Sequence, residues 1–278
     1  MGGCRQKCCP ALLCVTISAV LLCACSSTLP SAEVTPQSAA AAELAPDGRL
    51  RAAINFGNPV LATRDPATGE PRGVSVDLAR ELGRRLGVPV TLVTFDAAGK
   101  VVDAAKSNLW DVAFVAIDPV RAAEMEQTAP YVIIEGVYLV AQGSPISDNA
   151  AVDRDGVRIV VATGSAYDLY LTRELKHARL VRVPASPVVV DTMRSQKLEV
   201  SAGVRQQLEF DARRVGDVRV LPGRFMVIEQ AMALPKNRPA GARYLRDFVE
   251  EAKASGFVAR SLEGNGVQGA TVAPPAAH

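Results

Sequence analysis

The chain has 278 residues, of which 49% are hydrophobic and 22% charged, and its formal net charge is +2. A chain this close to neutrality, with no basic cluster, offers no electrostatic reason to expect a nucleic-acid partner. Its length suffices for a packed core, because chains of about 150 to 300 residues bury about 70–75% of the surface that they expose when unfolded.

The amino terminus has the pattern of an export signal. Arg5 and Lys7 form a short basic start, and the apolar run at 11–24 is shorter than the about 20 residues that a membrane-spanning helix needs. We therefore predict that residues 1–24 are a signal peptide. The run ends in Leu22-Cys23-Ala24-Cys25. This ending resembles the lipobox of bacterial lipoproteins, which implies that Cys25 is lipidated and becomes the first residue. The alternative is an ordinary signal peptide with incidental cysteines.

Cysteine usage excludes an internal disulfide in the exported chain. All six cysteines lie within the first 25 residues, and after cleavage only Cys25 remains. Cleavage also removes Arg5 and Lys7, which leaves 29 basic and 29 acidic residues. No second apolar run reaches spanning length, so we expect membrane contact through lipid alone.

Strand and helix patterns alternate along most of the chain. Residues 25–46, rich in Ser, Ala, Pro and Thr, are predicted to be a flexible tether, and residues 265–278 a disordered tail. Strands are expected at 50–55, 88–95, 112–117, 137–141, 158–161, 181–183, 218–221 and 226–234. Helices are expected at 76–86, 100–107, 167–175, 188–194 and 241–255. Gly256 is expected to end the last of them.

This alternation predicts an α/β fold with two lobes. Strands separated by helices favour mostly parallel sheets covered by helices, and such a series occurs twice. In open α/β sheets ligands bind beyond the carboxyl ends of the strands, which with two lobes means the cleft between them. The pattern alone leaves the ligand open.

An ordered set of motifs adds a resemblance to a known family. The motifs lie at 73–87 (GVSVDLARELGRRLG), 110–111 (WD), 118–121 (DPVR), 128–131 (TAPY), 162–168 (ATGSAYD) and 253–257 (KASGF). Over residues 47–264 the chain resembles the bacterial extracellular solute-binding proteins of family 3, the polar amino-acid receptors of ABC importers. The resemblance implies a two-lobed periplasmic-binding-protein fold with two hinge crossovers. Lobe one would be 47–133 and 236–264, and lobe two 134–235.

The resemblance also implies a function. The protein would be the extracytoplasmic solute-binding subunit of an ABC uptake system, held in the periplasm or at the cell surface by lipid on Cys25. It would bind a small carboxylate ligand by hinge closure, as a monomer and without cofactor or metal, and pass it to an ABC permease. We favour an amino acid as the ligand. The alternatives are an amino-free organic acid, a dehydratase on the same fold, and a sensory or scaffold lipoprotein.

Arg121 is the first candidate for the ligand site. In the family the arginine at this place grips the ligand carboxylate, and a guanidinium fork matches both carboxylate oxygens. Thr163, Gly164 and Ser165 are the second candidate, since free backbone N–H groups at a helix start receive anions. The alternatives are a surface arginine and a serine that only caps its own helix.

Three further candidates follow the first strand. Asn55, Phe56 and Asn58 stand where the family holds an acidic or polar residue and an aromatic lid over the ligand. The alternative for Phe56 is a place in the core, as is common for a single phenylalanine after a strand.

Two departures from the family pattern concern the ligand's ammonium group. Val204 stands where the amino-acid receptors carry an aspartate that pairs with this group. The loop before Arg121 is also shorter than in the family and lacks its serines, which leaves 115–117 (VAI). Asp118 is the candidate replacement, or else it caps the following helix.

The residues of an enzyme are not evident. His177, on an expected exposed helix, and His278 lie in no motif, so a Ser-His-Asp or Cys-His arrangement lacks its base. No CxxC, HExxH or other metal-ligand spacing is present. Glu199 or Glu229 would have to be the acid of a dehydratase, and nothing marks either. We therefore predict a binding protein that is not an enzyme.

Overall fold

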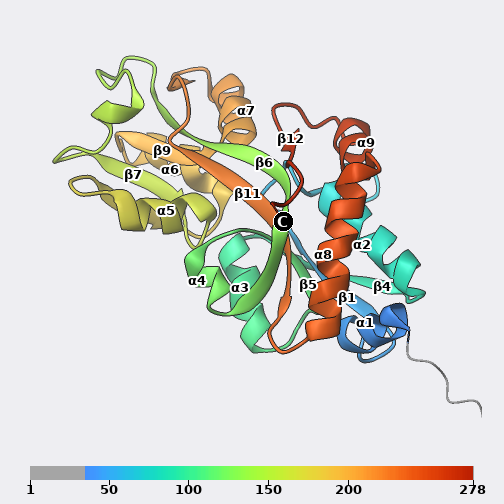
Figure 1. The fold of residues 1–278 in the computed structure, drawn as a ribbon. Helices are drawn as coiled ribbons and strands as arrows, with labels where there is room; N and C mark the ends of the chain where they lie inside the picture. Colours follow the sequence, from blue (N-terminus) through green and yellow to red (C-terminus); the bar gives the residue numbers. More distant parts are fainter. Residues whose placement is uncertain (1–34, 278) are drawn as a thin grey trace, which may run out of the picture. The chain divides into compact units, whose positions relative to one another are not determined.

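The structure is a computed structural model, and it describes residues 35–277. Within them ten strands form one mixed sheet in the order β4-β1-β5-β11-β6-β9-β7-β8, with β10 and β12 both paired to β6 (Figure 1). Strands β2 (Thr63–Arg64) and β3 (Pro71–Arg72) form a separate antiparallel pair.

The first half of the large sheet consists of three parallel strands and their helices. The strands are β1 (Leu50–Asn55), β4 (Val90–Phe95) and β5 (Val112–Ala116), and the helices are α2 (Val74–Leu86) and α3 (Ala98–Lys106). Helix α2 buries the apolar stripe of Leu78, Ala79, Leu82 and Leu86 against this half. It ends at Gly87, whose φ of +71° is left-handed and favours glycine.

Two long antiparallel strands cross from the first half of the sheet to the second, as predicted. They are β6 (Met125–Ala141) and β11 (Met226–Pro235), and they pair with each other over most of the length of β11. Strand β11 already pairs with β5 from Gln230 to Ala233, so its return to the first half begins before residue 236. The boundary expected at 236 directly follows this crossover strand, which pairs with strands of both halves.

The second half of the sheet repeats the strand–helix pattern. Its strands are β7 (Arg158–Ala162), β8 (Arg179–Val183), β9 (Val200–Val204) and β10 (Val218–Val220). Its helical elements are η1 (Asn149–Ala151), α5 (Ala166–Glu174), η2 (Ser186–Val188), α6 (Val189–Ser195) and α7 (Arg205–Val215). Strands β8 and β9 flank β7 in parallel, and β9 runs antiparallel to β6.

The predicted tether is wrong over residues 36–44, which form helix α1 (Pro36–Leu44). The Thr35 side chain accepts a hydrogen bond from the Ser38 N–H and so caps the helix start. Ala40 and Leu44 are fully buried, and α1 lies beside α8 (Pro239–Ala254) in Figure 1. The Ala-rich segment is ordered because this neighbour, distant in the sequence, covers it.

The predicted disordered tail is also wrong. After α9 (Phe257–Gly264) the chain forms β12 (Thr271–Val272), which pairs with β6 at Val132 and Ile133. The Lys253 Nζ donates to the Pro274 carbonyl at 2.8 Å. The end of the described chain is therefore attached to a hinge strand, through backbone pairing that composition does not reveal.

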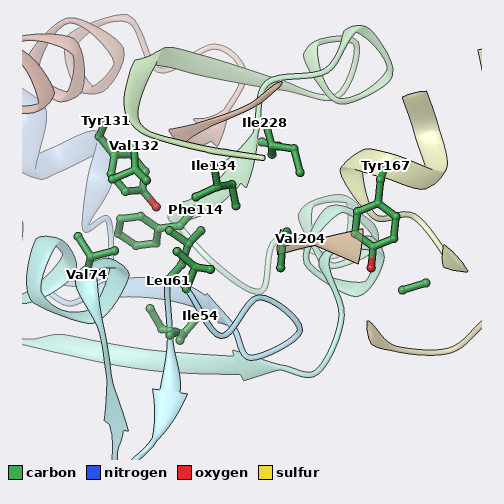
Figure 2. Close-up of a cluster of buried hydrophobic side chains, with 14 of the residues drawn as sticks. Ile54, Leu61, Val74, Phe114, Tyr131, Val132, Ile134, Tyr167, Val204 and Ile228 are labelled. Atoms are coloured by element: carbon green, nitrogen blue, oxygen red, sulfur yellow. The ribbon is translucent and has the colours of Figure 1, made fainter. Parts of the chain in front are cut away.

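One hydrophobic core runs through both halves of the sheet. Figure 2 shows part of it, from Ile54 and Phe114 in the first half to Val204 and Tyr167 in the second. A smaller cluster around the fully buried Trp110 packs on the other face of the first half, next to α3. In the part of the chain that the structure describes, no helix has the length and apolarity to cross a membrane.

Candidate functional site

A cavity of about 40 Å³ lies between the two halves of the sheet. Its walls include the ends of β1, β5, β7 and β9, which is where ligands bind in open α/β sheets. Six of the residues singled out from the sequence line it, namely Asn55, Asn58, Arg121, Thr163, Ser165 and Val204. The three others, Phe56, Gly164 and Asp118, are not part of its lining.

Arg121 is the charged residue of this lining. It sits on the single turn of α4 (Pro119–Ala122) and is only 1% exposed, so it is not a surface arginine. Its Nη1 donates to the Ala116 carbonyl at 3.0 Å, and its Nη2 donates across the cavity to the Gly164 carbonyl at 2.9 Å. Its buried Nε has no partner among the described residues.

Burial lowers the pKa of Arg121 to about 10, although the nearby charge of Asp118 opposes this shift. A pKa of about 10 still leaves the guanidinium charged at neutral pH. Asp118 forms its ion pair with Arg173, not with Arg121. The site therefore presents a buried cation with an unused donor, an arrangement that favours an anionic ligand.

In the turn between β7 and α5, the backbone N–H groups of residues 163–165 are not free, contrary to the expectation from the sequence. The Thr163 N–H donates to the Val183 carbonyl, the Gly164 N–H to the Asp168 carboxylate at 2.8 Å, and the Ser165 N–H to the Ala162 carbonyl. Asp168 folds back onto its own helix start to occupy the Gly164 amide, and backbone carbonyls occupy the other two. The Ser165 hydroxyl accepts from the Asp168 N–H and caps α5, as the alternative reading proposed.

Asp118 is a cap and an ion-pair partner. Its Oδ1 accepts from the Val120 N–H at 2.9 Å and so caps α4, and its Oδ2 lies 2.9 Å from the Arg173 Nη1. Arg173 belongs to α5, so this pair joins the two halves of the sheet. Asp118 is 4% exposed and is not among the residues that line the cavity.

The segment after β1 contributes two amides but no aromatic lid. Asn55 and Asn58 line the cavity, and their Oδ1 atoms accept from the backbone N–H groups of Gly57 and Val60. The Arg64 guanidinium instead lies over the Phe56 ring, 4.4 Å from its centroid, in a cation–π contact. The ring also packs against the core.

Several lining residues were not anticipated from the sequence. Tyr167 and Ser186 form a hydroxyl pair at 2.9 Å, and burial raises the pKa of Tyr167. Gln230 is 4% exposed and begins the buried stretch of β11 that continues through Ala231 to Leu234. The amide of Gln230 directly before the apolar run Ala231–Leu234 is the sequence signal that would have marked it. The sequence carries no comparable signal for Ile228 or Phe114, which supply apolar wall.

The residues considered for catalysis lie elsewhere. Glu199 pairs with Arg158 at 2.7 Å, and this hydrogen bond lowers the pKa of Glu199, which disfavours a role as an acid. Glu229 is exposed and outside the cavity lining. His177 is exposed but follows α5 instead of lying on it, because the chain turns there so that three N–H groups donate to Asp153.

Two further expectations concern metal and lipid. Residues 35–277 contain no group of three or more His, Cys, Asp or Glu side chains arranged to hold a metal ion. Cys25 lies outside the described residues.

Comparisons with known proteins define the class of this protein. The family model of the bacterial extracellular solute-binding proteins, family 3, matches residues 50–264, and the chain belongs to this family. It is therefore a solute-binding receptor of an extracellular family. No curated protein matches the sequence.

Solved structures show the same fold at low sequence identity. The chain is similar to a mutant of ArgBP from T. maritima, with a TM-score of 0.70, 19% identity and coverage of 81% of this chain and 98% of that chain. It is also similar to a solute receptor for L-cysteine of Neisseria gonorrhoeae, with a TM-score of 0.71 and 20% identity. That match covers 82% of this chain and 92% of the receptor chain. A third similar structure is a substrate binding protein of an amino acid ABC transporter, with a TM-score of 0.68 and 14% identity. That match covers 78% of this chain and 98% of the other chain. The predicted two-lobed periplasmic-binding-protein fold is confirmed.

Proposed function

We propose that this protein is the extracytoplasmic solute-binding subunit of an ABC uptake system, and that it captures a small carboxylate by closing its two halves around Arg121. The observation that carries the proposal is the buried guanidinium in the cavity, with an unpartnered Nε and no ion-pairing carboxylate among the described residues. A carboxylate bound there would restore the hydrogen bond and neutralise a charge that is costly to bury alone.

The geometry also supports capture by closure. Arg121 comes from the first half of the sheet and donates to Gly164 of the second, so the cavity exists only while the halves are in contact. Two crossover strands, β6 and β11, connect the halves and are the natural site of bending. The relatives named for L-cysteine and for amino acid transport have ligands that carry a carboxylate, and a carboxylate is the group that Arg121 would bind.

Binding is tested by thermal unfolding of the mature protein with a panel of the common amino acids and of small organic acids. A ligand at about 100 times its Kd stabilises the folded state by about 2.7 kcal/mol. For a domain of this size that is a rise of roughly 5–10 °C in Tm.

The role of Arg121 is tested with Arg121→Met and Arg121→Lys on the compounds that raise the Tm. We expect Arg121→Met to abolish the rise and Arg121→Lys to weaken it, because an ammonium lacks the planar fork. Arg154→Met, at an exposed arginine, is the control and should bind as the wild type does. Full binding by Arg121→Met, or no carboxylate in the panel that binds the wild type, would refute the proposal.

We also propose that the mature protein begins at Cys25, is anchored there by lipid and acts as a monomer beside an ABC permease. The support is the ending of the apolar run at Cys25. Mass spectrometry of the amino terminus of protein isolated from membranes should find a diacylglyceryl group on Cys25. An unmodified start at another residue would contradict the anchor and leave the binding proposal unaffected.

A further inference from the structure

We infer that the ligand is a small monocarboxylate that carries no ammonium group, such as a 2-oxo or 2-hydroxy acid. This inference rests on the proposed function, since it takes Arg121 as the carboxylate partner. It concerns what the rest of the cavity offers to the remainder of the ligand. An α-amino acid brings a second charge, with three N–H donors that need acceptors.

The lining of the cavity contains one charged side chain, that of Arg121, and no Asp or Glu. Two buried carboxylates occur on the segments that border it, Asp118 and Asp168, and both already have partners within the protein. Asp118 holds Arg173 and the start of α4. Asp168 holds Arg182 at 2.9 Å and the Gly164 N–H. If either carboxylate turned towards a ligand's ammonium group, its present cation or backbone N–H would lose its partner.

Several neutral polar side chains of the lining already make hydrogen bonds within the protein. The Oδ1 atoms of Asn55 and Asn58 accept backbone N–H groups, and the Thr163 hydroxyl donates to the Val183 carbonyl. The Gln230 amide is the main polar group of the lining that a ligand could bind without first breaking a hydrogen bond within the protein. One neutral amide does not replace a carboxylate for a buried ammonium, whose burial without a partner costs several kcal/mol.

The wall near β9 is apolar where a counter-charge would otherwise fit. Val204 is 6% exposed, lines the cavity and lies next to the apolar core that Figure 2 shows. It is also the N-cap residue directly before α7, and its side chain makes no capping hydrogen bond there. Ile228 of β11 and Phe114 of β5 extend this apolar wall.

The cavity also offers hydrogen-bond donors that a carboxylate and a neighbouring oxygen could use. They are the free Nε of Arg121, the Tyr167–Ser186 hydroxyl pair and the Gln230 amide. Donors suit a carboxylate with a neighbouring keto or hydroxyl oxygen, which needs no counter-charge. The cavity of about 40 Å³ is also far below the about 300–1,000 Å³ of pockets for drug-sized ligands, so the ligand is small.

The first experiment is isothermal titration of the wild-type protein with matched pairs at pH 7 and constant ionic strength. The pairs are pyruvate with alanine and 2-oxobutyrate with 2-aminobutyrate, which differ only at the 2-substituent. We expect the oxo acid of each pair to bind at least 100-fold more tightly than the amino acid.

The second experiment changes the wall with two variants of one size. Val204→Asp places a carboxylate in the cavity and Val204→Asn a neutral amide, and both residues are good helix caps for α7, so both variants should fold. We expect Val204→Asp to lose at least tenfold in affinity for the oxo acids and to gain binding of the amino acids. Val204→Asn should keep the wild-type preference.

The outcomes separate this inference from the proposed function. If the amino acids bind the wild type as tightly as the oxo acids, and Arg121→Met abolishes that binding, the inference is overturned and the proposed function stands. If Val204→Asp and Val204→Asn behave alike, charge does not decide the preference and the inference is overturned as well. If no carboxylate binds, both proposals fail together.

Discussion

At the scale of single residues, burying the Arg121 guanidinium at the proposed ligand site costs the folded state free energy. The lowered pKa means that the folded state holds this proton less tightly than the unfolded chain does. A shift to about 10 corresponds to a cost of about 3 kcal/mol at neutral pH, which is regained only as the pH rises from about 10 towards 12.5. The two hydrogen bonds from Arg121 to carbonyl groups return a similar amount, at about 1.5–3 kcal/mol each at most.

Because these contributions nearly cancel, we predict that Arg121→Met changes the free energy of unfolding by less than about 2 kcal/mol. Methionine has a comparable length, fills the site and needs no counter-charge. Urea unfolding of the unliganded protein, monitored by far-UV circular dichroism, measures the change. A loss of binding in this variant would then not be a loss of fold.

Arg51→Met is the matched comparison. The Arg51 guanidinium bonds both oxygens of Asp111, which is fully buried, and hydrogen bonding to Asp111 raises the pKa of Arg51. Removing this guanidinium leaves the buried carboxylate with Arg238 and the Arg51 backbone N–H, so we expect a loss approaching the about 3–5 kcal/mol of a broken buried pair. If Arg121→Met proves as costly as Arg51→Met, Arg121 is a structural residue.

At the scale of elements, the sequence predicts those whose apolar residues are periodic. The strand expected at 50–55 coincides with β1, and the helix expected at 76–86 lies within α2. Helix α7 has no counterpart among the predictions, because only Leu208 and Asp211 of its eleven residues are buried. The strand expected at 137–141 is only the end of β6, whose first part includes Glu126, Gln127 and Pro130.

Site residues were predictable to the extent that the family motif includes them. Arg121 and the 163–165 turn lie in such motifs, and the structure places Arg121, Thr163 and Ser165 at one cavity. Which backbone amides remain free was not predictable, because Asp168 reaches the Gly164 N–H only once α5 has formed. Likewise the order of residues 36–44 and 271–272 depends on distant partners, α8 and β6.

At the scale of the whole described chain, polar contacts join the two halves of the sheet in addition to the crossover strands and the shared core. The Arg173 Nη1 lies 2.9 Å from the Asp118 Oδ2, and Arg121 donates to the Gly164 carbonyl. The halves come so close that a Cβ on Gly164, whose φ is +69°, would lie 2.8 Å from the Gly99 Cα. If ligand is bound by closure, each contact made only in the closed state adds to the apparent affinity.

We therefore predict that Arg173→Met weakens ligand binding although Arg173 does not touch the ligand site. Its partner Asp118 is buried, but Arg173 itself is 39% exposed, so the pair contributes on the order of 0.2–1 kcal/mol and the Kd should rise by up to about fivefold. The difference from wild type should shrink as salt is raised from 0.05 to about 1 M, because added ions screen an exposed pair. Titration of the best ligand from the panel at several salt concentrations measures both effects.

Arg182→Met is the control that separates closure from general electrostatics. The Arg182–Asp168 pair has the same 2.9 Å distance and similar exposure, 43% and 5%, but both partners belong to the second half of the sheet. Its removal should therefore leave the balance between open and closed forms unchanged. Small-angle scattering without ligand should show a larger radius of gyration for Arg173→Met than for Arg182→Met. Equal radii and equal Kd values for the two variants would mean that the Asp118–Arg173 pair does not contribute to closure.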